Sequence, residues 1–188
     1  MAPEAPPASA RFRFNERKAT AAAAFLLEQE GGTMDHMRLV KLLYLAERGS
    51  LARLGHPLVG DTYYSLDQGP ILSRVLDLCK HKSSGPWAVQ IERSGPWAVR
   101  LGTTPNLGPL SPAELTVLED VAKAHRDRDQ WELSTLMHGF AEWKDPSGSR
   151  IEIAPSEILA ALGKTPEQIR EILDDAATDA QFDAVFGG

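Results

Sequence analysis

The segment LVKLLYLA, residues 39–46, limits the possible folds more than any other part of the sequence. Only Lys41 interrupts its apolar run, and a helix that is apolar on nearly all sides is normally buried at the centre of a helical domain. Thr33 is a suitable N-cap for this helix, and Gly55 is a suitable residue just beyond its end near Leu54. The sequence therefore predicts a central, buried helix.

The charged side chains of this helix fall on one narrow stripe. Arg38, Lys41 and Arg48 lie along it at helical spacing, together with Leu45. We interpret the stripe as a solvated face, because burying a charge without partners is costly. The alternative is that Lys41 is a buried functional amine.

Capping residues and apolar periodicity predict further helices around the central one. The expected helices start near Asn15, Thr33, Pro70, Ser111, Gln130, Pro155 and Thr165. Residues 58–66 are rich in β-forming types, and 150–153 is a second short extended piece. The predicted fold class is mainly α: a compact single helical domain of six or seven helices, with one small antiparallel β-hairpin at about 86–101.

The length of 188 residues suits one domain with tails. Residues 1–10 are mostly Ala and Pro, which predicts a disordered tail. We expect the domain to span residues 11–177. Residues 178–188 are Ala-rich and are expected to form a C-terminal tail or a frayed helix.

The predicted hairpin comes from a duplicated hexapeptide, SGPWAV, at residues 84–89 and 94–99. In each copy apolar and other residues alternate with period two, which is typical of a half-buried strand. Pairing the copies through a turn near Ser94 places Trp87 and Trp97 on one face. We expect that face to pack on helices, although two tryptophans that stack a ring-shaped ligand are the alternative.

The composition excludes several classes of function. The formal net charge of −6 disfavours an extended nucleic-acid footprint. No apolar run reaches the roughly 18 residues of a membrane span, so no membrane partner is expected. Cys79 is the only cysteine, which excludes an internal disulfide and favours a cytoplasmic location. No metal-binding or cofactor-binding motif is present, and neither a metal nor a cofactor is expected.

Two other functions stay open at this stage. A small hydrolase-like enzyme would use Asp61, Asp67 and His138, although turns, helix caps and a half-buried imidazole explain the same residues. A DNA-binding autoregulator would use the basic segment of residues 11–14 with its following basic residues at 17–18. No linear catalytic motif supports the enzyme.

Binding to a protein partner is favoured because nothing in the sequence indicates catalysis. Aromatic side chains dominate the energetics of protein interfaces. The candidate partner-binding residues are Lys41, Tyr44, Tyr63, Tyr64, Gln68, Gln90, Arg100, Trp131 and His138.

Six motifs in order resemble the Panacea-domain, or SocA-like, family. The first three are KLLYLA at 41–46, GHPLVGDTY at 55–63, and the Gly69-Pro70 pair. LSPAEL, then LSTLMH with a later tryptophan, and SGSR with a later ALGK follow at 110–115, 133–143 and 147–164. The resemblance covers about residues 15–175.

This resemblance implies a bacterial antitoxin that binds its cognate toxin protein directly. The partner would be a SocB-like protein or another product of a neighbouring gene. The resemblance also implies that neutralisation works by occlusion or by delivery of the toxin to the ClpXP protease, with the antitoxin as a proteolytic adaptor.

Overall fold

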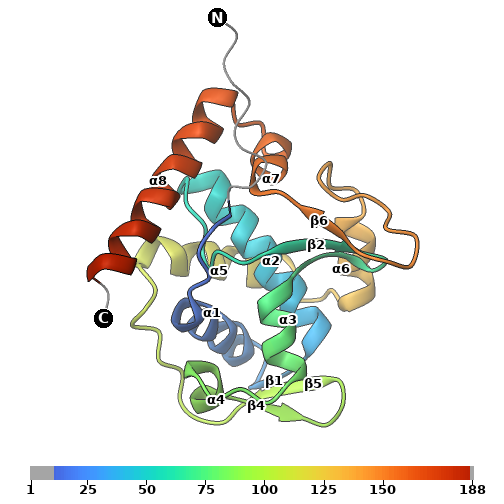
Figure 1. Ribbon diagram of the computed structural model, residues 1–188. Coiled ribbons are helices and arrows are strands. Elements are labelled where there is room, and N and C mark those ends of the chain that lie inside the picture. Colours follow the sequence, from blue (N-terminus) through green and yellow to red (C-terminus); the bar gives the residue numbers. More distant parts are fainter. Residues whose placement is uncertain (1–10, 187–188) are drawn as a thin grey trace, which may run out of the picture.

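Helix α2 (His36–Arg53) is the central element of the structure, and helices α1, α3, α5, α6 and α7 pack around it (Figure 1). The computed structural model describes residues 11–186. Every residue from 38 to 44 is buried, which confirms the predicted central helix. Its N-cap is Asp35 and not Thr33, because the Asp35 carboxylate accepts hydrogen bonds from the first N–H groups of the helix.

The described residues form eight helices and six short strands. The helices are α1 (Glu16–Gln29), α2 (His36–Arg53), α3 (Ser73–Lys80), α4 (Pro86–Gln90), α5 (Pro112–Ala124), α6 (Gln130–Met137), α7 (Pro155–Ala161) and α8 (Pro166–Phe186). The strands are β1 (Thr33–Asp35), β2 (Tyr63–Leu66), β3 (Gly69–Leu72), β4 (Ile91–Ser94), β5 (Ala98–Leu101) and β6 (Ile151–Ile153).

The predicted fold class, a single helical domain with one hairpin, is wrong. The strands form two antiparallel three-stranded sheets, in the orders β1-β5-β4 and β3-β2-β6. Each strand has only three or four residues, too few for a clear alternation of apolar and polar positions. The fold therefore contains both helices and sheets. The predicted disordered tail at residues 1–10 lies outside the described residues.

The Gly69-Pro70 pair does not open a helix as expected. Both residues lie in β3, where a proline is tolerated because β3 is an edge strand. Helix α3 begins three residues later, at Ser73, and its apolar face buries Cys79. Burial raises the pKa of the Cys79 thiol to about 12, so this thiol stays protonated at neutral pH.

The two copies of SGPWAV adopt different conformations. In the first copy Pro86 starts helix α4, and Trp87 is buried in the core. In the second copy residues 95–97 form a turn and Ala98 begins β5, which leaves Trp97 68% exposed. The expectation that the tryptophans share one packed face is wrong.

Contacts from elsewhere in the chain explain this difference. The carboxylate of Glu16 accepts a hydrogen bond from the N–H of Trp87 (3.2 Å), which holds the first turn of α4. The carbonyl of Trp97 instead accepts from the backbone N–H and the ring Nδ1–H of His36 (2.9 and 2.8 Å). The hairpin strands pair Ile91 with Leu101, and β1 forms the third strand of the sheet.

Glu47 positions the segment between α2 and β2. Its buried carboxylate accepts hydrogen bonds from the N–H groups of Leu58, Val59 and Gly60 at 2.8, 2.8 and 3.0 Å. The hydroxyl of Tyr63 donates a fourth, at 2.6 Å. Burial raises the pKa of Glu47, and these four donors stabilise its ionised form in return.

Among the described residues, no helix is both long and apolar enough to cross a membrane.

The different surroundings of Trp87 and Trp97 give a matched pair of substitutions. Trp87→Ala removes a large side chain from the core and should lower the free energy of unfolding by about 3–5 kcal/mol. Trp97→Ala removes an exposed ring and should lower it by less than about 1 kcal/mol. Urea denaturation followed by circular dichroism measures the free energy of unfolding of both variants. Equal decreases would contradict a buried Trp87 and an exposed Trp97.

Candidate functional site

The turn between β2 and β3 is held by side chains from three separate parts of the chain. The indole Nε1–H of Trp143 donates to the carbonyl of Leu66 (3.0 Å). The Nε2–H of His138 donates to the next carbonyl, that of Asp67 (2.9 Å). The rings of His138 and Trp143 also lie against each other, with centroids 4.2 Å apart. Two consecutive carbonyls are thus fixed by one aromatic pair.

Lys41 fixes the third carbonyl of the turn. Its amine donates to the carbonyl of Gln68, which also accepts from the hydroxyl of Ser134 in α6 (2.8 Å). The Lys41 side chain is completely buried, and burial lowers its pKa to about 8. The interpretation of this stripe as a solvated face is therefore wrong at Lys41, because the amine is buried and donates to a backbone carbonyl.

Gly69 fits closely beside this amine. Its φ of +101° belongs to the region that favours glycine, and a Cβ there would lie 3.3 Å from the Lys41 Nζ. The glycine before Pro70 is therefore required by the turn and by the buried lysine together.

The other charges of the α2 stripe are also partly or fully buried. The guanidinium of Arg38 donates to the carbonyls of residues 125, 126 and 128, just beyond the end of α5, where a cation is favourable. Arg48 binds the buried carboxylate of Glu142 through its Nε (2.6 Å), and the hydroxyl of Tyr44 donates to the same carboxylate (3.1 Å). These contacts fix the segment that carries Trp143.

The result is a rigid turn with exposed side chains. Asp67 and Gln68 are exposed at its tip, and His138 is exposed beside it. On the adjacent helix α6, Trp131 is 57% exposed and Leu136 37% exposed. We call these five residues the turn–α6 surface. A fixed backbone that presents an exposed tryptophan is the kind of surface on which protein partners find an anchor.

The structure brings together only some of the candidate residues. Gln68, Trp131 and His138 belong to the turn and to α6 with its C-cap, and Lys41 holds the turn from α2. Tyr44 is a buried support beneath them. The sequence analysis missed Ser134, Glu47 and Glu142 as structural determinants. Of these three residues, only Glu47 could have been noticed in the sequence, because its carboxylate directly follows the apolar run 39–46.

The remaining candidates lie elsewhere. Tyr63 is buried against Glu47, and the ring of Tyr64 is covered by the guanidinium of Arg150 (4.9 Å). Gln90 accepts a hydrogen bond from a backbone N–H through its side chain (2.7 Å), and Arg100 pairs with a glutamate on the neighbouring strand (2.8 Å). Both are in or beside the β1-β5-β4 sheet.

Asp61 has a structural role that occupies its carboxylate. The carboxylate accepts hydrogen bonds from the N–H groups of Thr62, Arg74 and Val75 (2.6, 2.9 and 3.0 Å), and so holds the start of α3. Burial raises its pKa to about 6. Asp67 accepts from the N–H of Gly148 (2.9 Å). These contacts explain both aspartates without a catalytic role.

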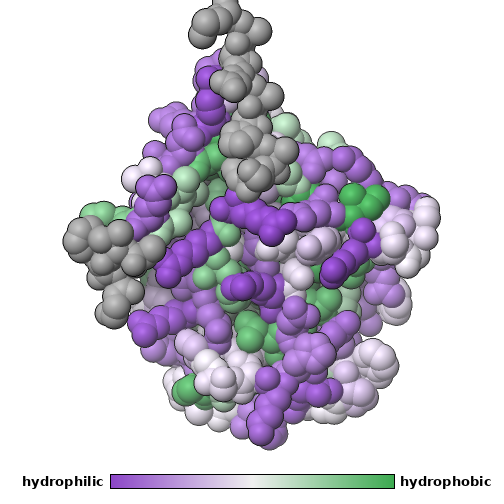
Figure 2. Space-filling view, in the orientation of Figure 1, coloured by the Kyte–Doolittle hydropathy of each residue, from purple (hydrophilic) through white to green (hydrophobic). Residues whose placement is uncertain are grey.

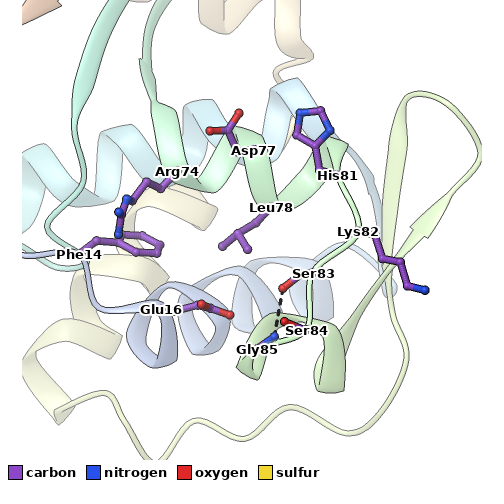
Figure 3. A pocket seen from close by; sticks show the side chains of 10 residues that line it. All are labelled: Phe14, Glu16, Arg74, Asp77, Leu78, His81, Lys82, Ser83, Ser84 and Gly85. Atoms are coloured by element: carbon purple, nitrogen blue, oxygen red, sulfur yellow. Dashed lines mark hydrogen bonds between the residues drawn. The ribbon is translucent and has the colours of Figure 1, made fainter.

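The described residues line two pockets, and neither pocket contains Asp61, Asp67 or His138 in its wall. The smaller, of about 440 Å³, lies between α3, the start of α1 and the loop at 83–85 (Figure 3). The guanidinium of Arg74 stands over the ring of Phe14 at one end of it, 5.4 Å from the ring centroid. Neither pocket joins the three residues that the hydrolase alternative needs.

The basic N-terminal segment makes contacts within the molecule. Arg11 pairs with Glu152 (2.8 Å), and Lys18 pairs with the buried carboxylate of Glu114 (2.6 Å). These ion pairs neutralise part of the segment that the DNA-binding alternative invokes.

A comparison with known families finds one match. Residues 39–144, more than half of the chain, match the model described as antitoxin SocA-like, Panacea domain. The chain belongs to this family. The matched residues include all four side chains that hold the turn, from Lys41 to Trp143. Membership in the Panacea family supports an antitoxin role. No curated protein matches the chain, and no solved structure does.

The Panacea motifs in this chain are explained by local structure. Gly60 has a φ of +68°, and a Cβ there would lie 2.3 Å from the carbonyl oxygen of Arg13. The neighbouring Asp61 and Tyr63 make the buried hydrogen bonds described above. The buried residues of the KLLYLA and GHPLVGDTY motifs therefore maintain the fold that presents the turn, and their own side chains are inaccessible to a partner.

Lys41→Met should loosen the turn without unfolding the domain. The apolar replacement removes a costly buried charge, and the Gln68 carbonyl keeps its bond from Ser134, so the free energy of unfolding should change by less than about 1 kcal/mol. Hydrogen–deuterium exchange of a peptide covering residues 64–72 should rise at least tenfold. Trp131→Ala, which leaves the turn contacts intact, is the control, and unchanged exchange in Lys41→Met would contradict the role of the amine.

Asp61 should make stability depend on pH. Because its pKa is raised to about 6 in the folded protein, its protonated form favours folding, and this contribution is lost as the pH rises from about 4 through 6. The loss amounts to up to about 3 kcal/mol. Urea denaturation between pH 4 and 7 should show a flatter pH dependence for Asp61→Asn than for the unchanged chain. The same pH dependence of the free energy of unfolding in both proteins would contradict the raised pKa of Asp61.

Proposed function

We propose that this protein is the antitoxin of a toxin–antitoxin pair, and that it neutralises its toxin by binding it directly through the turn–α6 surface. Membership in the SocA-like, Panacea-domain family is the observation that carries the proposal. The proposed partner is the protein encoded next to this gene, whether SocB-like or of another type, and the proposed location is the cytoplasm.

The geometry of the turn supports the choice of surface. Three consecutive carbonyls are hydrogen-bonded from within the protein, so the turn loses little conformational freedom when a partner binds. Trp131 lies on the neighbouring helix, and its exposed ring has apolar area available for burial. Rigid presentation and an aromatic anchor together favour affinity.

Neutralisation has two possible mechanisms, which share this binding step. Occlusion requires only that the antitoxin covers the active surface of the toxin. As an adaptor, the antitoxin would also hold the toxin near the ClpXP protease and so raise the effective concentration of the toxin there. A reconstituted degradation assay separates the two, because only an adaptor accelerates loss of the toxin when ClpXP and ATP are supplied.

Co-purification with the product of the adjoining gene tests the binding step. The unchanged antitoxin should form a complex with it, and Trp131→Ala should weaken that complex at least tenfold, since truncation of an interface tryptophan often costs 2 kcal/mol or more. Trp97→Ala is the matched control, because Trp97 is similarly exposed but lies on the hairpin. Absence of any complex with the unchanged chain would refute the proposed function.

A further inference from the structure

A loop of residues 145–150 lies beside the turn between β2 and β3, at the same edge of the molecule (Figure 1). The backbone N–H of Gly148 donates to the carboxylate of Asp67 at 2.9 Å, and Asp67 is part of the turn–α6 surface. Strand β6 begins directly after the loop, and its first residue, Ile151, pairs with Ser65 of β2. The loop is therefore continuous with the turn–α6 surface.

The backbone of this loop is fixed by hydrogen bonds within the loop. The carboxylate of Asp145 accepts from the N–H of Ser147 at 2.8 Å. The N–H and the hydroxyl of Ser149 both donate to the carbonyl of Pro146, at 3.1 and 2.9 Å. Ser147 has a φ of +49°, and a residue other than glycine keeps such a conformation only where surrounding contacts hold it. The loop thus presents its exposed side chains from a defined backbone.

Arg150 is the one charged residue of the segment 144–152 whose side chain has no polar partner within the described chain. Lys144 pairs with Glu157 at 2.5 Å, and Glu152 pairs with Arg11 at 2.8 Å. The carboxylate at position 145 accepts the hydrogen bond described above. Every nearby charge except that of Arg150 is therefore satisfied within the protein.

The ring of Tyr64 holds the guanidinium of Arg150 in place. The guanidinium carbon lies 4.9 Å from the centroid of this ring. Tyr64 is half-buried in β2, the middle strand of its sheet, between Ile71 of β3 and Glu152 of β6. A cation–π contact uses one face of a guanidinium and leaves the N–H donors at its edge available. Because Arg150 is exposed, a partner can reach these donors.

The chemistry of the guanidinium determines which group it binds best. It has five N–H donors and no acceptor, and a carboxylate both accepts two of its hydrogen bonds and neutralises its charge. A backbone carbonyl leaves the charge unpaired. The surface over the β3-β2-β6 sheet carries strongly hydrophilic residues next to apolar ones (Figure 2). Arginine is enriched at protein interfaces, where such mixed surfaces meet a partner.

We infer that Arg150 binds a carboxylate of the toxin, and that Tyr64 is the positioning residue for this contact. The inference rests on the proposed function and names the chemistry of one contact beside the turn–α6 surface. Trp131 offers apolar area for burial, whereas Arg150 selects by charge. A toxin with an acidic residue at this place is favoured, and a toxin with a basic residue there is repelled.

Neutral substitution of the arginine tests the contact by its effect on binding. Arg150→Gln should weaken binding of the adjoining gene's product about tenfold or more in biolayer interferometry, because the carboxylate of the toxin loses its charged partner. The matched control is Arg74→Gln. Arg74 is also exposed and stacked on an aromatic ring, that of Phe14, but it lies at the start of α3, beyond the end of β3 that is farther from the turn. The control should stay within about threefold of the unchanged chain.

A double-mutant cycle tests the role of Tyr64. Tyr64→Leu removes the ring and should weaken binding in the unchanged chain, but it should add little to the effect of Arg150→Gln. Tyr64→Phe keeps the ring and should bind as the unchanged chain does. Equal weakening by Tyr64→Leu in both backgrounds would contradict its action through Arg150. Raising the salt from about 50 to about 300 mM should also weaken the unchanged chain more than Arg150→Gln.

A zero-length crosslink identifies the carboxylate. Arg150→Lys places a primary amine at the same position, and a carbodiimide activates a carboxylate so that this amine forms an amide with it. Mass spectrometry of the digested complex should find position 150 joined to an aspartate or glutamate of the toxin. Arg74→Lys is the matched control and should give no such product. Circular dichroism checks that each variant is folded.

The outcomes separate the two proposals. Weaker binding by Arg150→Gln but not by Arg74→Gln, with a crosslink from position 150, supports the inference. If the unchanged antitoxin binds the toxin but Arg150→Gln binds equally well, or no crosslink forms at 150, Arg150 does not bind a carboxylate of the toxin and the proposed function still stands. If the unchanged antitoxin does not bind the adjoining product, the proposed function fails and the inference fails with it.

Discussion

Charged side chains on α2 that are buried or half-buried fix the segments around the helix, because each finds polar partners inside the protein. Lys41 finds the carbonyl of a turn, Glu47 finds three N–H groups of the next segment, and Arg48 finds Glu142. An unpartnered charge at any of these positions would cost several kcal/mol. The helix therefore determines where three irregular segments lie, and through them the position of both the β3-β2-β6 sheet and the exposed turn.

The sequence predicted the central helix well because a nearly continuous apolar run has few alternatives to burial. It also predicted the helix start at Ser111, since the capping box of Ser111 and Glu114 is a local pattern whose hydrogen bonds form within one turn of helix. Gly69-Pro70 was misassigned because a proline suits the first turn of a helix and an edge strand equally. Pairing with β2 across the two-residue turn Asp67-Gln68 decides between the two, and this turn has none of the usual hairpin dipeptides such as Asn-Gly or Asp-Gly.

The candidate site was predicted in part. Lys41, Gln68, Trp131 and His138 were all candidates in the sequence, but it did not predict why Lys41, Gln68 and His138 lie together. Their contacts run through backbone carbonyls, and a carbonyl is present at every residue, so its use as an acceptor leaves no trace in side-chain identity. The burial of Lys41 was predicted wrongly for the same reason, because its partner is not an acidic residue that spacing would reveal.

The two conformations of SGPWAV limit how strongly this hexapeptide can prefer either a helix or a turn with a strand. The last four residues of the hexapeptide are helical in one copy and form part of a turn and a strand in the other. Their intrinsic preference for either state must therefore be smaller than the few kcal/mol that neighbouring contacts supply. Glu16 decides the first case and His36 the second. The duplicated sequence therefore does not determine one conformation, and the residues that surround each copy determine which structure that copy adopts.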